Sequence, residues 1–190
     1  MMARPRVYLA GPEVFLPDAI AKGWEKCQVA AEMGLEGVFP LDAALDLSGL
    51  SKLEQARRIS VANEGLMRTC DALIANLTPF RGVSMDAGTA FEVGFMRALG
   101  RPVAGYANVV EDYATRARTF RAGVRLAGDS DGPDVDVEDF GLGENLMIEI
   151  AIIESGLSVA RATVAPGQEM RDLGAFRAAL AGLRNVLGVA

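Results

Sequence analysis

Length, composition and charge limit this chain to a few classes of protein. Its 190 residues, 51% of them hydrophobic, are enough to bury the core of one domain and do not suggest two. The formal net charge of −6 disfavours a nucleic acid polymer as a partner, because phosphate backbones are bound by basic surfaces. We therefore expect a single globular domain over residues 1–190.

The absence of histidine narrows the possible chemistry further. It excludes Ser-His-Asp and Cys-His catalytic groups, so acid–base chemistry must use carboxylates, Tyr, Lys or Cys. Cys27 and Cys70 stand in apolar surroundings without disulfide or metal spacing, and we expect reduced core thiols, no metal site and a cytoplasmic protein. We expect no membrane association, because no signal-peptide pattern and no run of about 18 apolar residues is present.

The hydrophobic pattern predicts strands that alternate with helices. The predicted strands occupy residues 6–10, 38–40, 72–77 and 102–106, with a last strand within 157–164. The predicted helices occupy residues 17–34, 88–99, 145–154 and 170–187, and one more begins at Ser48 or Ser51 and ends at Cys70. The third strand is apolar apart from Asn76, as expected for a central parallel strand that is covered on both sides. The repeated strand–helix order predicts an α/β fold with a doubly wound parallel sheet of about five strands.

Four of the predicted helices carry apolar stripes at helical spacing, which we expect to face the core. The stripes are Ile20, Trp24, Cys27 and Ala31; Leu53, Ala56, Ile59 and Leu66; Phe91, Phe95 and Leu99; and Met170, Leu173, Phe176, Leu180, Leu183 and Leu187. Residues 107–143 show no such pattern and are rich in glycine and acidic residues. Because so long an irregular stretch is unusual in a compact domain unless it is functional or mobile, we interpret it as a flap over the site.

The strongest chemical signal is the run Asp-Ala-Gly-Thr-Ala-Phe-Glu, from Asp86 to Glu92. It follows the third strand and its loop, where open α/β sheets bind their ligands. Glu92 stands one helical turn after Gly88, whose missing side chain leaves room for a ligand. Two carboxylates at one cavity could act as in a retaining glycosidase, one as nucleophile and one on the leaving-group proton. Alternatively, Asp86 is a helix N-cap and Glu92 a partner of the helix dipole.

Three further residues are candidates for the same site. Asp71 stands at one end of the third strand, and Tyr8 and Phe15 flank a Gly11-Pro12 turn after the first strand. A phenol could orient the attacking carboxylate, and a phenyl ring could stack on a nucleobase. The alternative for both aromatic residues is an ordinary place in the core.

Four blocks of sequence together resemble the nucleoside 2-deoxyribosyltransferases. They span residues 8–18, 70–82, 86–94 and 141–147, occur in the order of that family, and are joined by weaker similarity over most of residues 6–187. The resemblance implies a flavodoxin-like fold and an exchange of nucleobases on 2-deoxyribose through a covalent deoxyribosyl-enzyme, without a cofactor. The implied partners are small-molecule deoxynucleosides and free nucleobases.

The same resemblance assigns roles to individual residues. Glu92 would be the nucleophile, Tyr8 would orient it, and Asp71 and Asp86 would contact the base and manage its proton. Asn145 would come from a neighbouring subunit and bind the sugar hydroxyls, which implies a homodimer or a larger homo-oligomer with shared active sites. The residues expected to contact the substrate are Gly11, Phe15, Gly88, Asn145 and Met147.

Two alternatives remain open at this point. A related branch of enzymes hydrolyses deoxynucleoside monophosphates, and Ser84 and Arg81 are the residues that could serve a phosphate here. A nucleoside-binding module without turnover is the other alternative. The chain also departs from close relatives at Asn76, where they often carry Asp, and in the length of residues 107–143.

Overall fold

The structure is a computed structural model that describes residues 3–40, 45–123 and 136–189. Within these residues the strands are β1 (Arg6–Ala10), β2 (Glu36–Val38), β3 (Ala72–Asn76), β4 (Val103–Ala107) and β5 (Ala160–Arg161). The helices are the short 3-10 helix η1 (Pro12–Phe15) and the α-helices α1 (Ala19–Glu32), α2 (Lys52–Arg68), α3 (Ala87–Ala98), α4 (Tyr113–Gly123), α5 (Leu146–Ile153) and α6 (Gly174–Val186). None of the described helices combines the length and hydrophobicity needed to cross a membrane.

The five strands form one parallel sheet in the order β2-β1-β3-β4-β5. This order confirms the predicted doubly wound α/β domain and is the flavodoxin-like order. The second strand was wrong at its bounds: it was expected at 38–40 and lies at Glu36–Val38, because its pairing with β1 ends at Tyr8 and Val38. The last strand lies within the expected 157–164 and has two residues.

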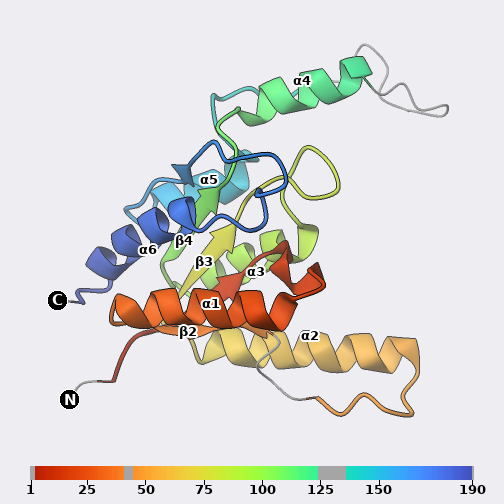
Figure 1. Cartoon of the computed structure of the whole chain (residues 1–190), viewed down its shortest axis with the longest axis vertical. Helices are drawn as coiled ribbons and strands as arrows, with labels where there is room; N and C mark the ends of the chain where they lie inside the picture. The colour runs from red at the N-terminus through yellow and green to blue at the C-terminus, as the bar shows by residue number, and fades with distance from the viewer. Residues whose placement is uncertain (1–2, 41–44, 124–135, 190) are drawn as a thin grey trace.

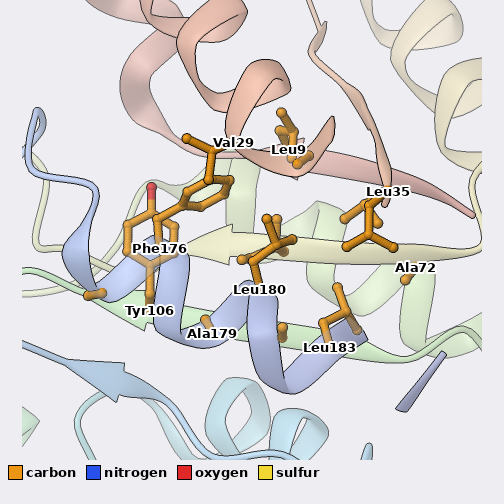
Figure 2. Close-up of a cluster of buried hydrophobic side chains, with 14 of the residues drawn as sticks. Leu9, Val29, Leu35, Ala72, Tyr106, Phe176, Ala179, Leu180 and Leu183 are labelled. Carbon is orange, nitrogen blue, oxygen red and sulfur yellow. The ribbon is translucent and has the colours of Figure 1, made fainter. Parts of the chain in front are cut away.

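Helices cover both faces of this sheet (Figure 1). On one face α1 and α6 pack against the sheet, and Figure 2 shows Phe176, Leu180 and Leu183 of α6 in the middle of this core. Phe176 meets Tyr106 of β4 edge to face, with 5.5 Å between the ring centroids. On the other face α2, α3 and α5 enclose a second core, to which β1 contributes Tyr8. The alternation of side chains along β1 therefore directs Tyr8 towards α3.

The buried face of α1 differs from the predicted one. Ile20 and Trp24 are 76% and 66% exposed, whereas Lys22 and Lys26 are buried. The Lys26 ammonium donates a hydrogen bond to Glu13 Oε1 at 2.8 Å. An apolar stripe marks the core face of a helix only when the charges on the other face reach solvent, and these lysines instead find partners inside the protein.

The predicted apolar stripe of α3 also turns partly outward. Phe91 is 58% exposed, and Leu99 is exposed as well. The buried residues of the helix are Thr89, Val93 and Met96. With this rotation, Glu92 reaches across to the side chain of Tyr8 in β1.

Residues 107–143 contain a helix that the sequence pattern did not predict. Helix α4 occupies Tyr113–Gly123, and Figure 1 shows it extending away from the sheet. Residues 124–135, which make up the middle of the predicted flap, lie outside the described residues.

Candidate active site

A hydrogen bond between Tyr8 and Glu92 lies at the centre of the candidate site. Tyr8 Oη donates to Glu92 Oε1 at 2.8 Å. Strand β1 holds the buried phenol, and the second turn of α3 supplies the carboxylate. Because two regular elements hold the two groups, their relative position is rigid.

A cavity of about 440 Å³ opens beside this pair, within the usual size of small-molecule sites. The predicted residues that line it are Gly11, Phe15, Asp86, Gly88 and Glu92. It lies beyond the carboxyl end of β1, where parallel sheets bind ligands. Its lining combines the carboxylates of Asp86 and Glu92 with apolar side chains such as Phe15 and Ile59. The cavity can therefore place charged groups beside one part of a ligand and apolar contacts beside a flat aromatic part.

Burial controls the protonation of the central pair. It raises the pKa of the Glu92 carboxyl to about 7, an effect that the nearby Asp86 charge reinforces and the Tyr8 hydrogen bond opposes. Burial and the Glu92 charge together hold the pKa of the Tyr8 phenol far above its ordinary value, so the phenol stays protonated as a donor. Glu92 therefore exchanges between its acid and carboxylate forms near neutral pH, and its ionised form is the one that Tyr8 stabilises.

Asp86 is both a capping residue and part of the cavity wall. It is the N-cap of α3, and its Oδ2 atom accepts hydrogen bonds from Thr89 N at 3.0 Å and Thr89 Oγ1 at 3.3 Å. It also lines the cavity. No described residue donates to its Oδ1 atom. Capping therefore fixes the orientation of the carboxylate and leaves one oxygen available to a ligand.

The two glycines in the cavity wall are explained by close packing. A Cβ atom on Gly11 would lie 2.0 Å from Glu13 Oε2 and 2.9 Å from the Asn76 Cβ atom. One on Gly88 would lie 3.0 Å from Asp86 Oδ2. Side chains at these positions would displace the residues beneath the cavity floor or the capping carboxylate.

The structure does not bring Asp71 to this cavity. In a parallel sheet, the residue before a strand lies at the amino edge, opposite the carboxyl ends that form the site. There Asp71 accepts a hydrogen bond from Arg6 N at 2.8 Å and lies 3.9 Å from Arg101. The carboxyl end of β3 instead carries Asn76, whose amide is buried and donates to Glu13 Oε1 at 3.1 Å.

Asn145 and Met147 also lie outside the cavity lining. Asn145 is the N-cap of α5, where its Oδ1 atom accepts from Met147 N at 3.0 Å and its Nδ2 atom donates to Glu138 at 2.8 Å. The side chain of Met147 is 73% exposed. Within one chain these two residues therefore belong to the surface around α5. No described residue of 107–143 lines the cavity either.

Several residues that line the cavity were not predicted from the amino-acid sequence. They are Val14, Pro40, Leu45, Leu47, Ile59, Asn63 and Thr89. Ile59 and Asn63 lie one turn apart on the same face of α2, and a polar residue within an apolar stripe is the signal that could have indicated them. Asn63 adds an uncharged amide to the cavity wall.

A buried carboxylate joins the loop before α3 to the segment before α5. Glu144 accepts a hydrogen bond from Ser84 Oγ at 2.5 Å and lies 3.5 Å from Arg116 of α4. Arg116 also donates to the Val83 carbonyl at 2.9 Å. These contacts hold the two segments together. The Ser84 hydroxyl already has a hydrogen-bond partner within the protein.

Comparison with known proteins identifies the family. The model of the nucleoside 2-deoxyribosyltransferase family matches residues 7–147. The chain belongs to this family. A 2-deoxyribosyltransferase from Leishmania mexicana is 33% identical, with a TM-score of 0.56 over 76% of this chain and 85% of that chain. The matched region contains Tyr8, Asp86 and Glu92.

Two further relatives extend the comparison. A conserved protein from Enterococcus faecalis shares the fold at 16% identity, with a TM-score of 0.55 over 95% of this chain and 99% of that chain. An uncharacterized protein of Schizosaccharomyces pombe is 37% identical over 119 residues, which are 62% of this chain and 56% of the relative. The match thus spans about half the length of that curated relative.

Proposed function

We propose that this protein is a nucleoside 2-deoxyribosyltransferase that exchanges nucleobases on 2-deoxyribose through a covalent deoxyribosyl-Glu92 intermediate. The observation that carries the proposal is the Tyr8–Glu92 hydrogen bond at the wall of a cavity that also contains Asp86. Family membership supports the same reaction. The 33% identity to the Leishmania mexicana 2-deoxyribosyltransferase supports it as well.

In the first half of the reaction, a Glu92 carboxylate oxygen bonds to C1′ of the deoxynucleoside as the N-glycosidic bond breaks. The electron pair of that bond leaves with the base, and a ring nitrogen of the base takes up a proton through Asp86. Tyr8 keeps the attacking oxygen in place by its hydrogen bond and stabilises its charge. The negative carboxylate also stabilises the oxocarbenium-like transition state.

The second half reverses these steps with a different base. A ring nitrogen of the incoming base bonds to C1′, the ester bond to Glu92 breaks, and the proton returns through Asp86. Two displacements at C1′ retain its configuration. The apolar wall, which includes Phe15 and Ile59, contacts the flat face of either base, and Asn63 adds an amide that can donate to and accept from its edge.

The active form in this proposal is a homo-oligomer in which a neighbouring subunit supplies Asn145 and Met147. Neither residue lines the cavity of its own chain. Helix α5 exposes Met147, Ile150 and Ile153, and the adjoining α3 exposes Phe91. A group of exposed apolar side chains on neighbouring helices is typical of a protein interface.

Hydrolysis of deoxynucleoside monophosphates has less support from the site. The Ser84 hydroxyl, which could have bound a phosphate, is hydrogen bonded to the buried Glu144. This contact therefore favours a nucleoside over a nucleoside monophosphate as the substrate.

Incubation of the protein with deoxyinosine and free adenine tests the proposal. We expect deoxyadenosine to form, as measured by chromatography, and to be absent with Glu92→Ala. The matched control is Glu64→Ala, which removes a carboxylate of α2 that does not line the cavity. If no purine or pyrimidine pair is exchanged, the transferase proposal is wrong. Free deoxyribose without an acceptor base would then indicate a hydrolase, and substrate binding without any product would indicate a binding module.

A further inference from the structure

Arg81, in the loop after β3, has an unusual backbone conformation. Its φ angle is 57°, and among the described residues it is the only non-glycine residue with a positive φ. A side chain in this left-handed region is uncommon because its Cβ atom crowds the backbone. Since the neighbouring Gly82 would adopt such a conformation freely, the placement of the arginine itself needs an explanation.

The Arg81 side chain lies against two stacked aromatic rings. Phe15 and Phe80 stack with 5.4 Å between their centroids and 10° between their planes. The Arg81 Cζ atom is 4.9 Å from the centroid of Phe15 and 4.6 Å from that of Phe80. The guanidinium therefore contacts both rings, and the cluster joins η1 after β1 to the loop after β3.

This cluster reaches the candidate active site through one of its members. Phe15 lines the cavity although it is 54% exposed. An aromatic side chain on the surface changes rotamer readily unless neighbours hold it. Arg81 forms no ion pair with any described residue, so its described contacts are those with the two rings.

We propose that Phe80 and Arg81 are positioning residues that hold the Phe15 ring as a preformed stacking surface for the nucleobase. The inference rests on the proposed function, because it requires a base in the cavity. A ring that is already oriented costs less ordering when the base binds, so the cluster acts on base affinity. Loss of these contacts leaves Asp86 and Glu92 in place on α3, so the rate of the chemical step does not change.

The test compares substitutions of two arginines that both stack on phenylalanine. Arg81→Asn removes the guanidinium, and asparagine tolerates the left-handed backbone. Arg68→Asn is the matched control, because the Arg68 Cζ atom lies 4.8 Å from the Phe95 centroid and neither residue lines the cavity. The measurements are the KM for adenine in the exchange reaction, kcat, the melting temperature, and adenine binding by equilibrium dialysis.

We expect Arg81→Asn to raise both the KM and the Kd for adenine about tenfold, since contacts with two rings are lost, with little change in kcat. Arg81→Lys, which keeps the charge without the planar group, should recover part of the affinity. Arg68→Asn should leave adenine affinity unchanged.

Three results would overturn the inference. The first is unchanged adenine affinity in Arg81→Asn, and the second is an equal loss in both asparagine variants. The third is a wild-type protein that binds no base. If exchange fails in the wild type while adenine still binds and Arg81→Asn still weakens that binding, the proposed function is wrong and the stacking surface stands.

Discussion

Tyr8 opposes the effect of burial on the protonation of the proposed nucleophile. Its phenol donates to Glu92 and lowers a pKa that burial has raised. Because only the ionised carboxylate attacks C1′, the kcat/KM of the wild type should rise with pH and level off above the Glu92 pKa of about 7. Tyr8→Phe removes the opposing hydrogen bond, so the rising limb should move to higher pH and the activity at neutral pH should fall.

Initial rates of base exchange measured across a series of pH values check this prediction. Tyr113→Phe removes a phenol from α4, away from the cavity, and should leave the profile unchanged. A Tyr8→Phe profile that keeps the wild-type midpoint would show that the phenol does not control the ionisation of Glu92.

The raised pKa of Glu92 also has a consequence for stability. A carboxyl whose pKa rises from 4.5 to about 7 on folding stabilises the protein fully below pH 4.5, and this contribution is lost as pH rises through 7. Replacement by neutral glutamine should therefore increase the free energy of unfolding at pH 8 by about 2–3 kcal/mol. Near pH 4 the two proteins should be equally stable.

Urea unfolding of wild type and Glu92→Gln at pH 4 and pH 8 measures this difference. Glu64→Gln, at a half-buried site on α2 that does not line the cavity, controls for the substitution itself. Equal stability of wild type and Glu92→Gln at pH 8 would contradict the burial of an ionised carboxylate at this position.

At the scale of single elements, α1 is anchored by a buried ion pair. Glu13 Oε1 accepts hydrogen bonds from Lys26 at 2.8 Å, Tyr106 at 2.7 Å and Asn76 at 3.1 Å. Burial favours the neutral acid, but the Lys26 charge and the hydrogen bonds from Lys26 and Tyr106 outweigh it and lower the pKa of Glu13. No described residue bonds to the buried Glu13 Oε2 atom, so the ionised carboxyl depends on Lys26.

Lys26→Met should destabilise the protein by about 3–5 kcal/mol at pH 7, because it leaves Glu13 buried without its counter-charge. Without Lys26, burial raises the Glu13 pKa, so the loss should become smaller as pH falls and the carboxyl takes up a proton. The double variant Glu13→Gln, Lys26→Met should recover much of the loss. Chemical unfolding at pH 5 and pH 7 distinguishes these outcomes, and a loss that is independent of pH would contradict the account.

The same helix shows where sequence patterns fail at this scale. The position and length of α1 followed from its spacing and from Gly34, but its core face did not. Ile20 and Trp24 look like core residues, and Lys26 looks like a surface residue, until Glu13 is known to lie beneath it. The partner of a buried charge comes from another element, and helical periodicity contains no information about it.

At the scale of the whole molecule, the parallel sheet and the acidic side of the cavity were predictable, whereas seven of the twelve residues that line the cavity were not. Parallel strands bring their carboxyl ends to one edge, which is why Tyr8, Phe15 and Asp86 could be placed together from the chain alone. Asp71 was misplaced because it precedes its strand. The α2 wall, with Ile59 and Asn63, was missed because its position across the cavity depends on packing between distant segments.

The proposed assembly gives a prediction about the surface of α5. Ile150 is 41% exposed there, and Ile150→Asp should dissociate the oligomer and reduce exchange activity about tenfold or more, because a charge in an apolar interface is strongly disfavoured. Light scattering after gel filtration, together with the exchange assay, measures both effects. The control Ile20→Asp changes an equally apolar exposed residue of α1. Dissociation by the α1 variant alone would place the interface elsewhere.

The covalent deoxyribosyl-Glu92 intermediate is the central claim, and intact mass spectrometry after incubation with a deoxynucleoside tests it most directly. We expect the wild type to gain the mass of one deoxyribosyl group, which a peptide digest should locate at Glu92 and which added adenine should remove. Glu92→Ala should gain no such mass. An adduct on another residue, or base exchange at full rate in the Glu92→Ala protein, would contradict the account.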